Sequence, residues 1–399
     1  MQNKNLWFFN HYAQGSNLPG GTRHFDLGLE LVEKGYNVTI FCSGYHHTLL
    51  KHVVEYNDKG FYEEINNGVK FIWVKTFPYK ANNWKRMLNT VSYALKLNKI
   101  IPKLGLEKPD YIIGSTVHPF APLIASKMAR RFKAKYIMEI RDLWPQTFID
   151  MNLWKESSIT AKFFKYIEKI SVIKSSKIIV LSPLTIGYLK DNYNYNKDNI
   201  LLLPNGVNKN YINKDVLNNE VSRKINITYL GGIEKVHGLE FMVDLASKIN
   251  DVNVTFNIYG DGKEKQYLRN KSIQSGNNNI VWHDPVSKSI VPNILAQATL
   301  LFVSTSNVLY GSENKLYDYM ASGKPIVLAI RGSHNDPIKE IGCGVSLSRD
   351  NLAESATKLM TFIDEEFKNF NDLGLKGQSY VIKNRTIDLL SDKLIEFLK

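Results

Sequence analysis

Short apolar runs alternate with longer amphipathic segments along the whole chain. The runs are rich in β-branched and aromatic residues, which is typical of strands buried in a parallel sheet. The clearest of them lie at 6–9, 38–42, 110–114, 135–140, 176–182, 226–230, 254–259, 300–304 and 325–330. The segments between them have the length and apolar spacing of helices, as at 84–101 and 382–398. This alternation predicts an α/β protein with doubly wound sheets.

The length of the chain and one polar stretch predict two domains. A chain of 399 residues exceeds what one hydrophobic core usually organises. Residues 208–224 are rich in Asn and Lys and carry few large apolar residues, as expected of a domain boundary. We therefore expect an N-terminal domain at 1–207, a linker at 208–224, a C-terminal domain at 225–380 and a final helix at 381–399.

The net charge points to an anionic partner. The chain has 51 basic and 38 acidic residues, so its net charge is +13, which suits nucleic acid, an anionic membrane or a phosphorylated substrate. Its two cysteines lie in different halves, which fits a reducing cytoplasm better than a disulfide framework. The first residues lack the shape of a signal peptide, and no apolar run approaches the ~18 residues of a membrane span.

The stretch 311–327, GSENKLYDYMASGKPIV, has the features of a phosphate-binding helix start. Ser312 is a candidate N-cap, and Gly323 with Pro325 ends the helix before a buried strand. A helix start attracts phosphate through its free N–H groups and dipole. Those groups belong here to Asn314, Lys315 and Leu316, and Lys315 adds a full charge. Asp318, one turn further, suits ribose hydroxyls; the alternative is a plain packed helix with a solvated Asp318.

This stretch resembles the nucleotide-sugar signature of retaining glycosyltransferases of family 4, which have the GT-B fold. The ending from Met320 to Pro325 matches that signature, and Asp318 stands where the second acid of Glu-x7-Glu belongs. The first acid falls at Tyr310, and whether Glu313 replaces it is open. The resemblance implies two Rossmann-like domains facing a central cleft. The second domain would bind the nucleotide sugar and the first the acceptor, and the final helix would cross back to the first domain.

Three further segments match glycine-containing loops of the same family. The first is Gly20-Gly21 followed by Arg23, which is either a simple turn or a close approach to a ligand. It is not GxGxxG, so a nicotinamide enzyme is disfavoured. The second carries Lys235 and Gly238. The resemblance implies that these two segments bind the donor diphosphate. The third implied contact is with the base, by loops that include Gly260 and Val286.

Two motifs follow predicted strands of the N-terminal domain. His118 begins HPFA after the strand at 110–114, where the carboxyl ends of parallel strands face a ligand crevice. The strand at 135–140 runs into EIRDLWPQ, whose Glu139, Arg141 and Asp142 form either cleft chemistry or a buried ion-pair network. Together the motifs resemble those of transferases of N-acetylated amino sugars in O-antigen and capsule assembly, including N-acetyl-L-fucosamine transferases. We expect these four residues to be catalytic, and for His118 the resemblance implies contact with the sugar hydroxyls or the developing positive charge.

A basic and aromatic segment predicts membrane contact. Residues 70–108 contain nine basic residues and one acid, interleaved with aromatic residues, and 84–101 fits an amphipathic helix. A second basic run lies at 155–177. Such helices bind anionic bilayers, although an ordinary surface helix or a nucleic-acid face has the same composition. We expect a cytoplasmic protein, peripheral on the inner face of a bacterial plasma membrane.

The combined expectation is a hexosyltransferase. It would move an N-acetylated amino sugar, best N-acetyl-L-fucosamine, with retention from a UDP-sugar to an undecaprenyl-diphosphate-linked saccharide. No cofactor or metal is expected, because Lys235, Lys315 and two helix starts can balance the diphosphate charge. One alternative is a UDP-N-acetylhexosamine 2-epimerase, which would act without acceptor. A remote alternative is a nucleic-acid-binding protein, which no recognisable motif supports.

Overall fold

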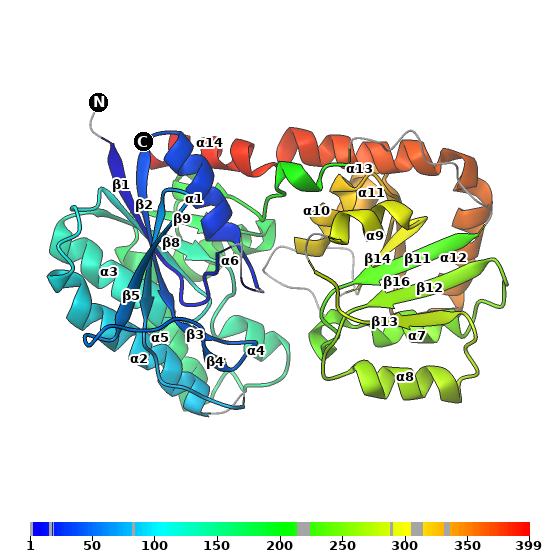
Figure 1. Cartoon of the computed structure of the whole chain (residues 1–399), viewed down its shortest axis with the longest axis horizontal. Coiled ribbons are helices and arrows are strands. Elements are labelled where there is room, and N and C mark those ends of the chain that lie inside the picture. Colours follow the sequence, from blue (N-terminus) through cyan, green and yellow to red (C-terminus); the bar gives the residue numbers. More distant parts are fainter. Residues whose placement is uncertain are drawn as a thin grey trace. The chain divides into compact units, whose positions relative to one another are not determined.

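The computed structural model describes residues 3–15, 18, 20–81, 84–213, 224–287, 290–304, 314–330 and 336–399. These residues divide into two compact units (Figure 1). The N-terminal unit holds the described residues up to Asn205 together with Ile387–Lys399. The C-terminal unit holds those from Gly206 to Thr386. Each unit is built on one sheet and has its own core.

The N-terminal sheet has eight strands in the order β10-β9-β8-β7-β1-β2-β6-β5. The strands are β1 (Lys4–Phe9), β2 (Tyr36–Ser43), β5 (Phe61–Asn66), β6 (Val69–Val74), β7 (Tyr111–Ser115), β8 (Lys135–Ile140), β9 (Lys177–Val180) and β10 (Ile200–Leu202). All neighbours are parallel except β5 and β6. The exception is a hairpin whose turn, Asn67-Gly68, has positive φ at both residues, as a type I′ turn requires. A short ribbon of β3 (Tyr45–His46) and β4 (Lys51–His52) follows β2.

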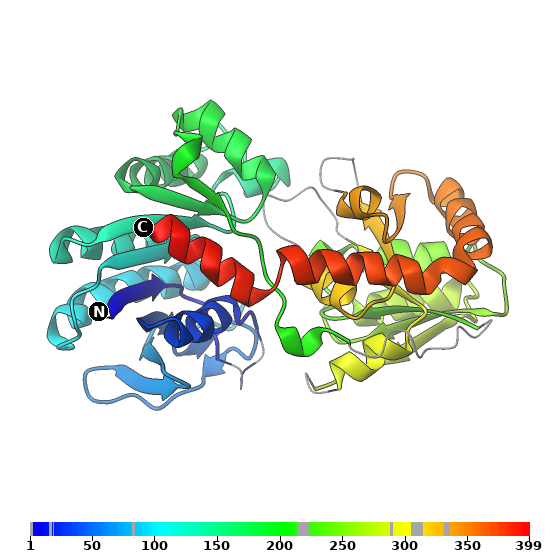
Figure 2. The same cartoon turned by 90° about the horizontal axis from the view of Figure 1, so that it is seen from above.

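Helices cover both faces of this sheet. They are α1 (Arg23–Glu33), α2 (Trp84–Ile100), α3 (Phe120–Phe132), α4 (Gln146–Asp150), α5 (Ile159–Lys174), α6 (Pro183–Tyr193) and α14 (Ile387–Leu398). One core layer joins α2, α3, α5 and α6 to the sheet, and α3 packs between α2 and α5. The other layer joins α1 and α14 to the sheet. These two helices lie side by side, and α14 is the red helix at the C-terminus in Figure 2. Lys34 at the end of α1 pairs with Asp388 and Asp392 of α14, at 2.9 and 2.6 Å.

The C-terminal sheet is entirely parallel, in the order β13-β12-β11-β14-β15-β16. Its strands are β11 (Ile225–Leu230), β12 (Val254–Tyr259), β13 (Ile280–His283), β14 (Leu300–Ser304), β15 (Ile326–Ile330) and β16 (Gly344–Ser348). The helices are α7 (Glu240–Ala246), α8 (Lys265–Gln274), α9 (Val291–Gln297), α10 (Asn314–Ala321), α11 (Pro337–Ile341), α12 (Leu352–Glu366) and α13 (Phe370–Asn384). Short 3-10 turns lie at Ile101–Lys103, Lys197–Asn199, Lys209–Tyr211, Lys235–His237 and Phe367–Asn369.

Two predicted helices differ in their bounds. The helix start expected at Lys235 is instead the 3-10 turn Lys235–His237, and α7 begins only at Glu240 because Gly238 has a left-handed φ of 58°. The single final helix is two helices, α13 and α14. The two helices are separated at residues 385–386. There the backbone oxygen of Arg385 accepts a hydrogen bond from the N–H of Val207 at 2.8 Å. Among the described residues, no helix is long and apolar enough to cross a bilayer.

Candidate functional site

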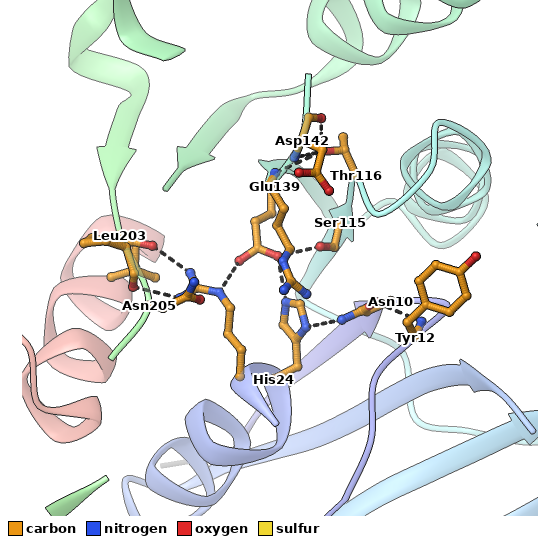
Figure 3. A network of polar contacts seen from close by, with 12 residues as sticks. Asn10, Tyr12, His24, Ser115, Thr116, Glu139, Asp142, Leu203 and Asn205 are labelled. Carbon is orange, nitrogen blue, oxygen red and sulfur yellow. Dashed lines mark hydrogen bonds and ion pairs between the residues drawn. The ribbon is translucent and has the colours of Figure 1, made fainter. Parts of the chain in front are cut away.

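A buried ionic network closes the carboxyl end of β8. Glu139 is 1% exposed. Its Oε1 accepts from Arg23 Nε at 2.9 Å, and its Oε2 accepts from His24 Nε2 and Ser115 Oγ, both at 2.7 Å. Figure 3 shows His24 between Asn10 and this carboxylate. The network joins the start of α1 to the ends of β7 and β8, so it fixes the frame on which the following loops stand.

Arg23 is occupied by protein acceptors on its other nitrogens. Nη1 donates to Pro204 O at 2.8 Å and to Asn205 Oδ1 at 3.3 Å, and Nη2 donates to Leu203 O at 2.7 Å. The side chain is only 6% exposed. A guanidinium has five N–H donors, and those of Arg23 that bind protein acceptors stabilise the fold. In this structure Arg23 and Glu139 form the ion-pair alternative, and the diphosphate contact of Arg23 and the catalytic role of Glu139 stay predictions.

The protonation states in this network follow from its hydrogen bonds. Asn10 Oδ1 accepts from Tyr12 N–H at 3.1 Å, so its amide nitrogen donates to His24 Nδ1 at 2.7 Å. His24 is then a neutral imidazole that donates through Nε2, and burial lowers its pKa. Burial alone would raise the pKa of Glu139, but the charges and hydrogen bonds of its partners hold it well below the usual range. Arg23 is the fixed positive charge in that set.

Thr116 joins the two loops that carry the remaining N-terminal candidates. Its Oγ1 accepts from the backbone N–H of Arg141 at 2.9 Å and of Asp142 at 3.3 Å, and it donates to Asp142 O at 2.9 Å (Figure 3). Asp142 is exposed and Arg141 is half-buried. The turn after β8 is thus tied to the loop after β7, which leads to His118. The side chains of Arg141 and Asp142 stand at the edge of the sheet where a parallel fold binds its ligands.

His118 has one ring nitrogen ready for a ligand. Nδ1 accepts from Phe120 N–H at 3.2 Å, so the neutral ring carries its proton on Nε2. Nε2 has no partner among the described residues, although the side chain is only 2% exposed. Burial holds the pKa of His118 well below its ordinary value. The residue therefore offers a neutral N–H donor, which suits a hydroxyl or carbonyl oxygen.

In the C-terminal unit, side chains from β11 and α10 place a cation beside a glycine loop. Lys315 Nζ donates to Tyr229 OH at 2.6 Å and lies 4.5 Å from the centre of that ring. Tyr319 OH exchanges hydrogen bonds with the backbone of Leu230, at 2.8 Å from its N and 3.0 Å from its O. These contacts hold the first turn of α10 against the end of β11. The described part of α10 begins at Asn314, and Leu316 is buried.

Glycines allow the other loops to close around this cation. A Cβ on Gly231 would lie 2.4 Å from Lys315 Cε, and one on Gly238 would lie 2.7 Å from Arg349 Nη1. A Cβ on Gly260 would lie 1.9 Å from the backbone oxygen of Gly231. Larger residues at these positions would push the loops apart. The structure thereby adds Arg349, which sequence reasoning missed because it follows the distant strand β16.

The remaining C-terminal candidates surround the same loops. Lys235 is exposed on its 3-10 turn, and burial together with Lys315 lowers the pKa of the neighbouring His237 to about 4. Asp318 is half-buried one turn into α10. Lys265 Nζ donates to Gly260 O at 2.8 Å and to His283 O at 3.1 Å. It thus joins the loop after β12 to the end of β13, where the half-buried Val286 follows.

Two family models match the chain in consecutive segments. The model described as Glycosyltransferase Family 4 matches residues 20–211. The model described as Glycosyl transferases group 1 matches residues 224–364. The chain is a glycosyltransferase. Its two Rossmann-like α/β units have the architecture of the GT-B fold. The first segment is of the family 4 type and the second is of the group 1 type.

Solved structures agree with the fold of this glycosyltransferase. A sucrose-phosphate synthase from Thermosynechococcus elongatus is 14% identical, covers 99% of this chain and 98% of its own, and has a TM-score of 0.78. WaaG, a glycosyltransferase involved in lipopolysaccharide biosynthesis, is 12% identical over 99% of both chains, with a TM-score of 0.69. HepE from Anabaena, solved in complex with UDP-glucose, is 14% identical over 99% of both chains, with a TM-score of 0.66. The search of curated proteins found no match.

The predicted residues of the glycosyltransferase fall into two sets, one in each unit. His118, Arg141 and Asp142 share one sheet edge in the N-terminal unit, near the Gly20-Gly21 loop and the network of Arg23 and Glu139. Lys315, Asp318 and the glycine loops share one corner of the C-terminal unit. Ser312, Tyr310 and Glu313 lie outside the described residues.

Proposed function

We propose that this glycosyltransferase moves an N-acetylated amino sugar, best N-acetyl-L-fucosamine, from a UDP-sugar to a polyprenyl-diphosphate-linked saccharide in capsule or O-antigen synthesis. The motifs after β7 and β8 support this substrate class through their resemblance to such transferases. They include His118, Arg141 and Asp142, which stand at one sheet edge. The solved complexes of HepE with UDP and with UDP-glucose support a UDP donor by analogy of fold.

One observation carries the proposal for the donor site. The ammonium of Lys315 is held by Tyr229 beside Gly231, directly at the start of α10. A fixed cation and a loop that admits close approach, at the start of a helix, together suit a diphosphate. Lys235 and Arg349 stand near the same loops and add positive charge. We propose that these groups balance the charge of the departing UDP without a metal ion or cofactor.

The remainder of the donor is proposed to bind around the diphosphate site. Asp318, one turn further into α10, is proposed to accept hydrogen bonds from the ribose hydroxyls. The loops of Gly260 and Val286, which Lys265 ties together, would frame the uracil through backbone groups. By the resemblance, Gly20 and Gly21 are proposed to approach the diphosphate with their backbone. Gly20 has a φ of 130°, which only glycine adopts without strain.

His118 is proposed to contact the transferred sugar. Because its imidazole is neutral and presents Nε2–H, it can donate to a sugar hydroxyl and orient the ring for attack. We propose that the acceptor attacks on the face from which UDP departs, so that the anomeric configuration is retained. Asp142, exposed at the same edge, is the carboxylate proposed to receive the proton of the acceptor hydroxyl.

A panel of donors tests this function. The enzyme is incubated with UDP-N-acetylhexosamines and UDP-hexoses, with and without an undecaprenyl-diphosphate-linked acceptor, and UDP release is followed. We expect an N-acetylated donor to give the fastest release, and we expect the acceptor to stimulate it. Formation of a C2 epimer of the donor without acceptor would support the epimerase and contradict the proposal.

We also propose that the N-terminal unit docks on an anionic membrane. Trp84, Leu88 and Leu95 of α2 are 67, 38 and 65% exposed. Ile159, Phe163 and Tyr166 of α5 are 88, 50 and 63% exposed, and Leu153 before α5 is 61% exposed. Exposed lysines accompany them, namely Lys85, Lys99, Lys155 and Lys162. Both helices flank α3 on one face of the sheet, so the two faces can meet one lipid surface.

Arg86 is not part of this docking surface. It donates from Nε to Tyr12 OH at 3.3 Å and lies 5.7 Å from the centre of the Tyr12 ring. The side chain therefore turns toward the interior of the unit. The surface is carried by the outward residues of α2 and by α5, whose segment belongs to the second basic run of the sequence.

Neutralising the four exposed lysines of the docking surface is expected to release the protein from anionic vesicles. Each lysine near such a surface contributes roughly 1 kcal/mol, and salt reduces the effect. Flotation of a Lys85→Gln, Lys99→Gln, Lys155→Gln, Lys162→Gln variant with vesicles of phosphatidylglycerol and phosphatidylcholine measures this. The control makes the same charge change at Lys358, Lys368, Lys376 and Lys383, which are exposed in the C-terminal unit. Equal flotation of both variants would show that this surface does not bind lipid.

A further inference from the structure

A groove of about 710 Å³ lies between α2, α3 and the start of β8. Its apolar walls come from both helices and include Ala94, Leu95 and Leu123. The strand residues that line it, Lys135 and Tyr136, are the first two of β8. The candidate functional site of this unit lies at the carboxyl ends of the strands, so the groove is separate from it.

Four basic side chains line this groove, and among the described residues no acid does. All four are exposed, and they are Lys127, Arg130, Lys135 and Lys174. Lys127 and Arg130 stand three residues apart on α3, so they share one face of that helix. Neither forms an ion pair with another described residue. Residues 84–106 and 111–138 contain no Asp or Glu, so the positive charge of the groove is not balanced locally.

Helix dipoles account for only part of this charge. Basic residues are favourable in the last turn of a helix, because they offset its negative end. Arg131 and Lys133 are exposed at that end of α3, but they lie outside the groove. Lys127 lines the groove and stands before the last turn. The effect of the dipole is confined to that turn, so it leaves Lys127 unexplained.

The groove is continuous with the proposed docking surface. Leu95 lines the groove, is 65% exposed, and shares one face of α2 with Trp84 and Leu88 at helical spacing. On α5, Ile173 is 66% exposed and precedes Lys174 of the groove. An exposed apolar band therefore leads into a groove that has apolar walls and cations. A phospholipid has the complementary chemistry, since it joins an anionic phosphate to apolar chains.

We propose that this groove binds one anionic phospholipid of the membrane, with its phosphate on Lys127 and Arg130 and part of an acyl chain along Leu95 and Leu123. The inference rests on the proposed membrane docking and names the lipid that the docking surface recognises. Lysine and arginine donate charge-assisted hydrogen bonds to phosphate oxygens. An acyl chain that covers the apolar walls removes them from water, which is favourable. A free phosphate ester would use the cations alone.

Short-chain lipids test the groove without a bilayer. The full chain is titrated by calorimetry with dihexanoyl-phosphatidylglycerol, below the concentration at which this lipid forms micelles. We expect saturable binding of one lipid per chain. Dihexanoyl-phosphatidylcholine, which has no net charge, is expected to bind more weakly. Glycerophosphoglycerol, which carries the same phosphodiester without acyl chains, is also expected to bind more weakly.

Variants of the groove separate its charge from its shape. Lys127→Gln with Arg130→Gln is expected to weaken binding of the short-chain phosphatidylglycerol roughly tenfold, through loss of charge-assisted contacts. The matched control is Arg131→Gln with Lys133→Gln, which makes the same charge change at the same end of α3 and should keep wild-type affinity. Ala94→Phe keeps the charge but fills the groove, so it is expected to weaken the lipid while Tm stays close to that of the wild type.

Two results would overturn the inference. Equal affinity of the two double variants would show that Lys127 and Arg130 do not hold the phosphate. Glycerophosphoglycerol that binds as tightly as the lipid would show a site for free phosphate esters. Flotation of the wild type with anionic vesicles is measured in parallel. Flotation without short-chain lipid binding would contradict the groove and leave the docking in place, whereas lipid binding without flotation would contradict the docking and support the groove.

Discussion

Glutamine in place of Glu139 is expected to destabilise the N-terminal unit by about 3–5 kcal/mol, because it leaves a buried guanidinium without its counter-charge. Arg23 would keep its bonds to Leu203, Pro204 and Asn205, but no carboxylate would face it. The network joins α1 to the ends of β7 and β8, so its loss should reduce the cooperativity of the unit as well. Urea unfolding, followed by tryptophan fluorescence, measures the change.

Glu168→Gln is the matched control for this prediction. Glu168 is another buried glutamate of the same unit, and its Oε1 accepts from Tyr188 OH at 2.8 Å and from Lys165 at 3.4 Å. Burial raises the pKa of Glu168, whereas the pKa of Glu139 is held well below its usual range. Burial therefore favours the protonated form of Glu168, which a neutral amide resembles. The partners of Glu139 favour its ionised form, which a neutral amide does not resemble. Equal losses in the two variants would contradict the assignment of Arg23 and Glu139 as a structural pair.

The pH dependence of stability is a second test of the same prediction. The folded-state pKa of Glu139 is depressed, so its contribution is present above the unfolded value of 4.5. That contribution is lost as the pH falls through the folded-state pKa. The wild type should therefore lose more stability than Glu139→Gln when both are acidified below pH 4.5. Parallel curves for the two proteins would show that the carboxylate is not paired.

Methionine in place of Lys315 is expected to weaken UDP binding by about 1.5–3 kcal/mol, roughly 10- to 150-fold, through loss of a charge-assisted contact. Methionine retains the length of the side chain, so the packing of α10 should change little. Calorimetry of UDP measures the loss. Lys358→Met, on the exposed face of α12, is the control for the change in net charge. Equal affinity of both variants would remove Lys315 from the diphosphate site.

Asp318→Ala locates the ribose in the same experiment. We expect the substitution to weaken UDP, and we expect it to weaken 2′-deoxy-UDP less, because the deoxy nucleotide lacks the hydroxyl that Asp318 is proposed to hold. The ratio of the two losses isolates that contact from any general disturbance of α10. Identical losses for the two nucleotides would mean that Asp318 does not touch the 2′-hydroxyl.

The sequence predicted well whatever depends on neighbours along the chain. The apolar runs at 135–140, 254–259 and 300–304 are β8, β12 and β14, with the same bounds. The helix at 84–101 is α2, one residue shorter. In α10, the spacing of about one turn between Lys315 and Asp318 follows from the local sequence alone. Strand and helix signals of this kind are local, so tertiary contacts altered little in them.

Features that depend on partners far along the chain were not predictable. The pattern Gly20-Gly21-x-Arg23 matched a diphosphate loop, but the acceptors that occupy Arg23 lie about 180 residues away, at Leu203 and Pro204. Arg349 meets Gly238 only because β16 joins the sheet edge. Each case needs the three-dimensional fold to decide which polar groups are satisfied.

The configuration of the transferred sugar tests the central claim most directly. The enzyme is incubated with a UDP-N-acetylhexosamine and an undecaprenyl-diphosphate-linked acceptor, and the product is examined by ¹H NMR. We expect one new anomeric signal with the configuration of the donor, formed in step with UDP release. An inverted anomer would contradict the proposed retaining mechanism, and a UDP-sugar epimer with no new glycosidic signal would contradict transfer altogether.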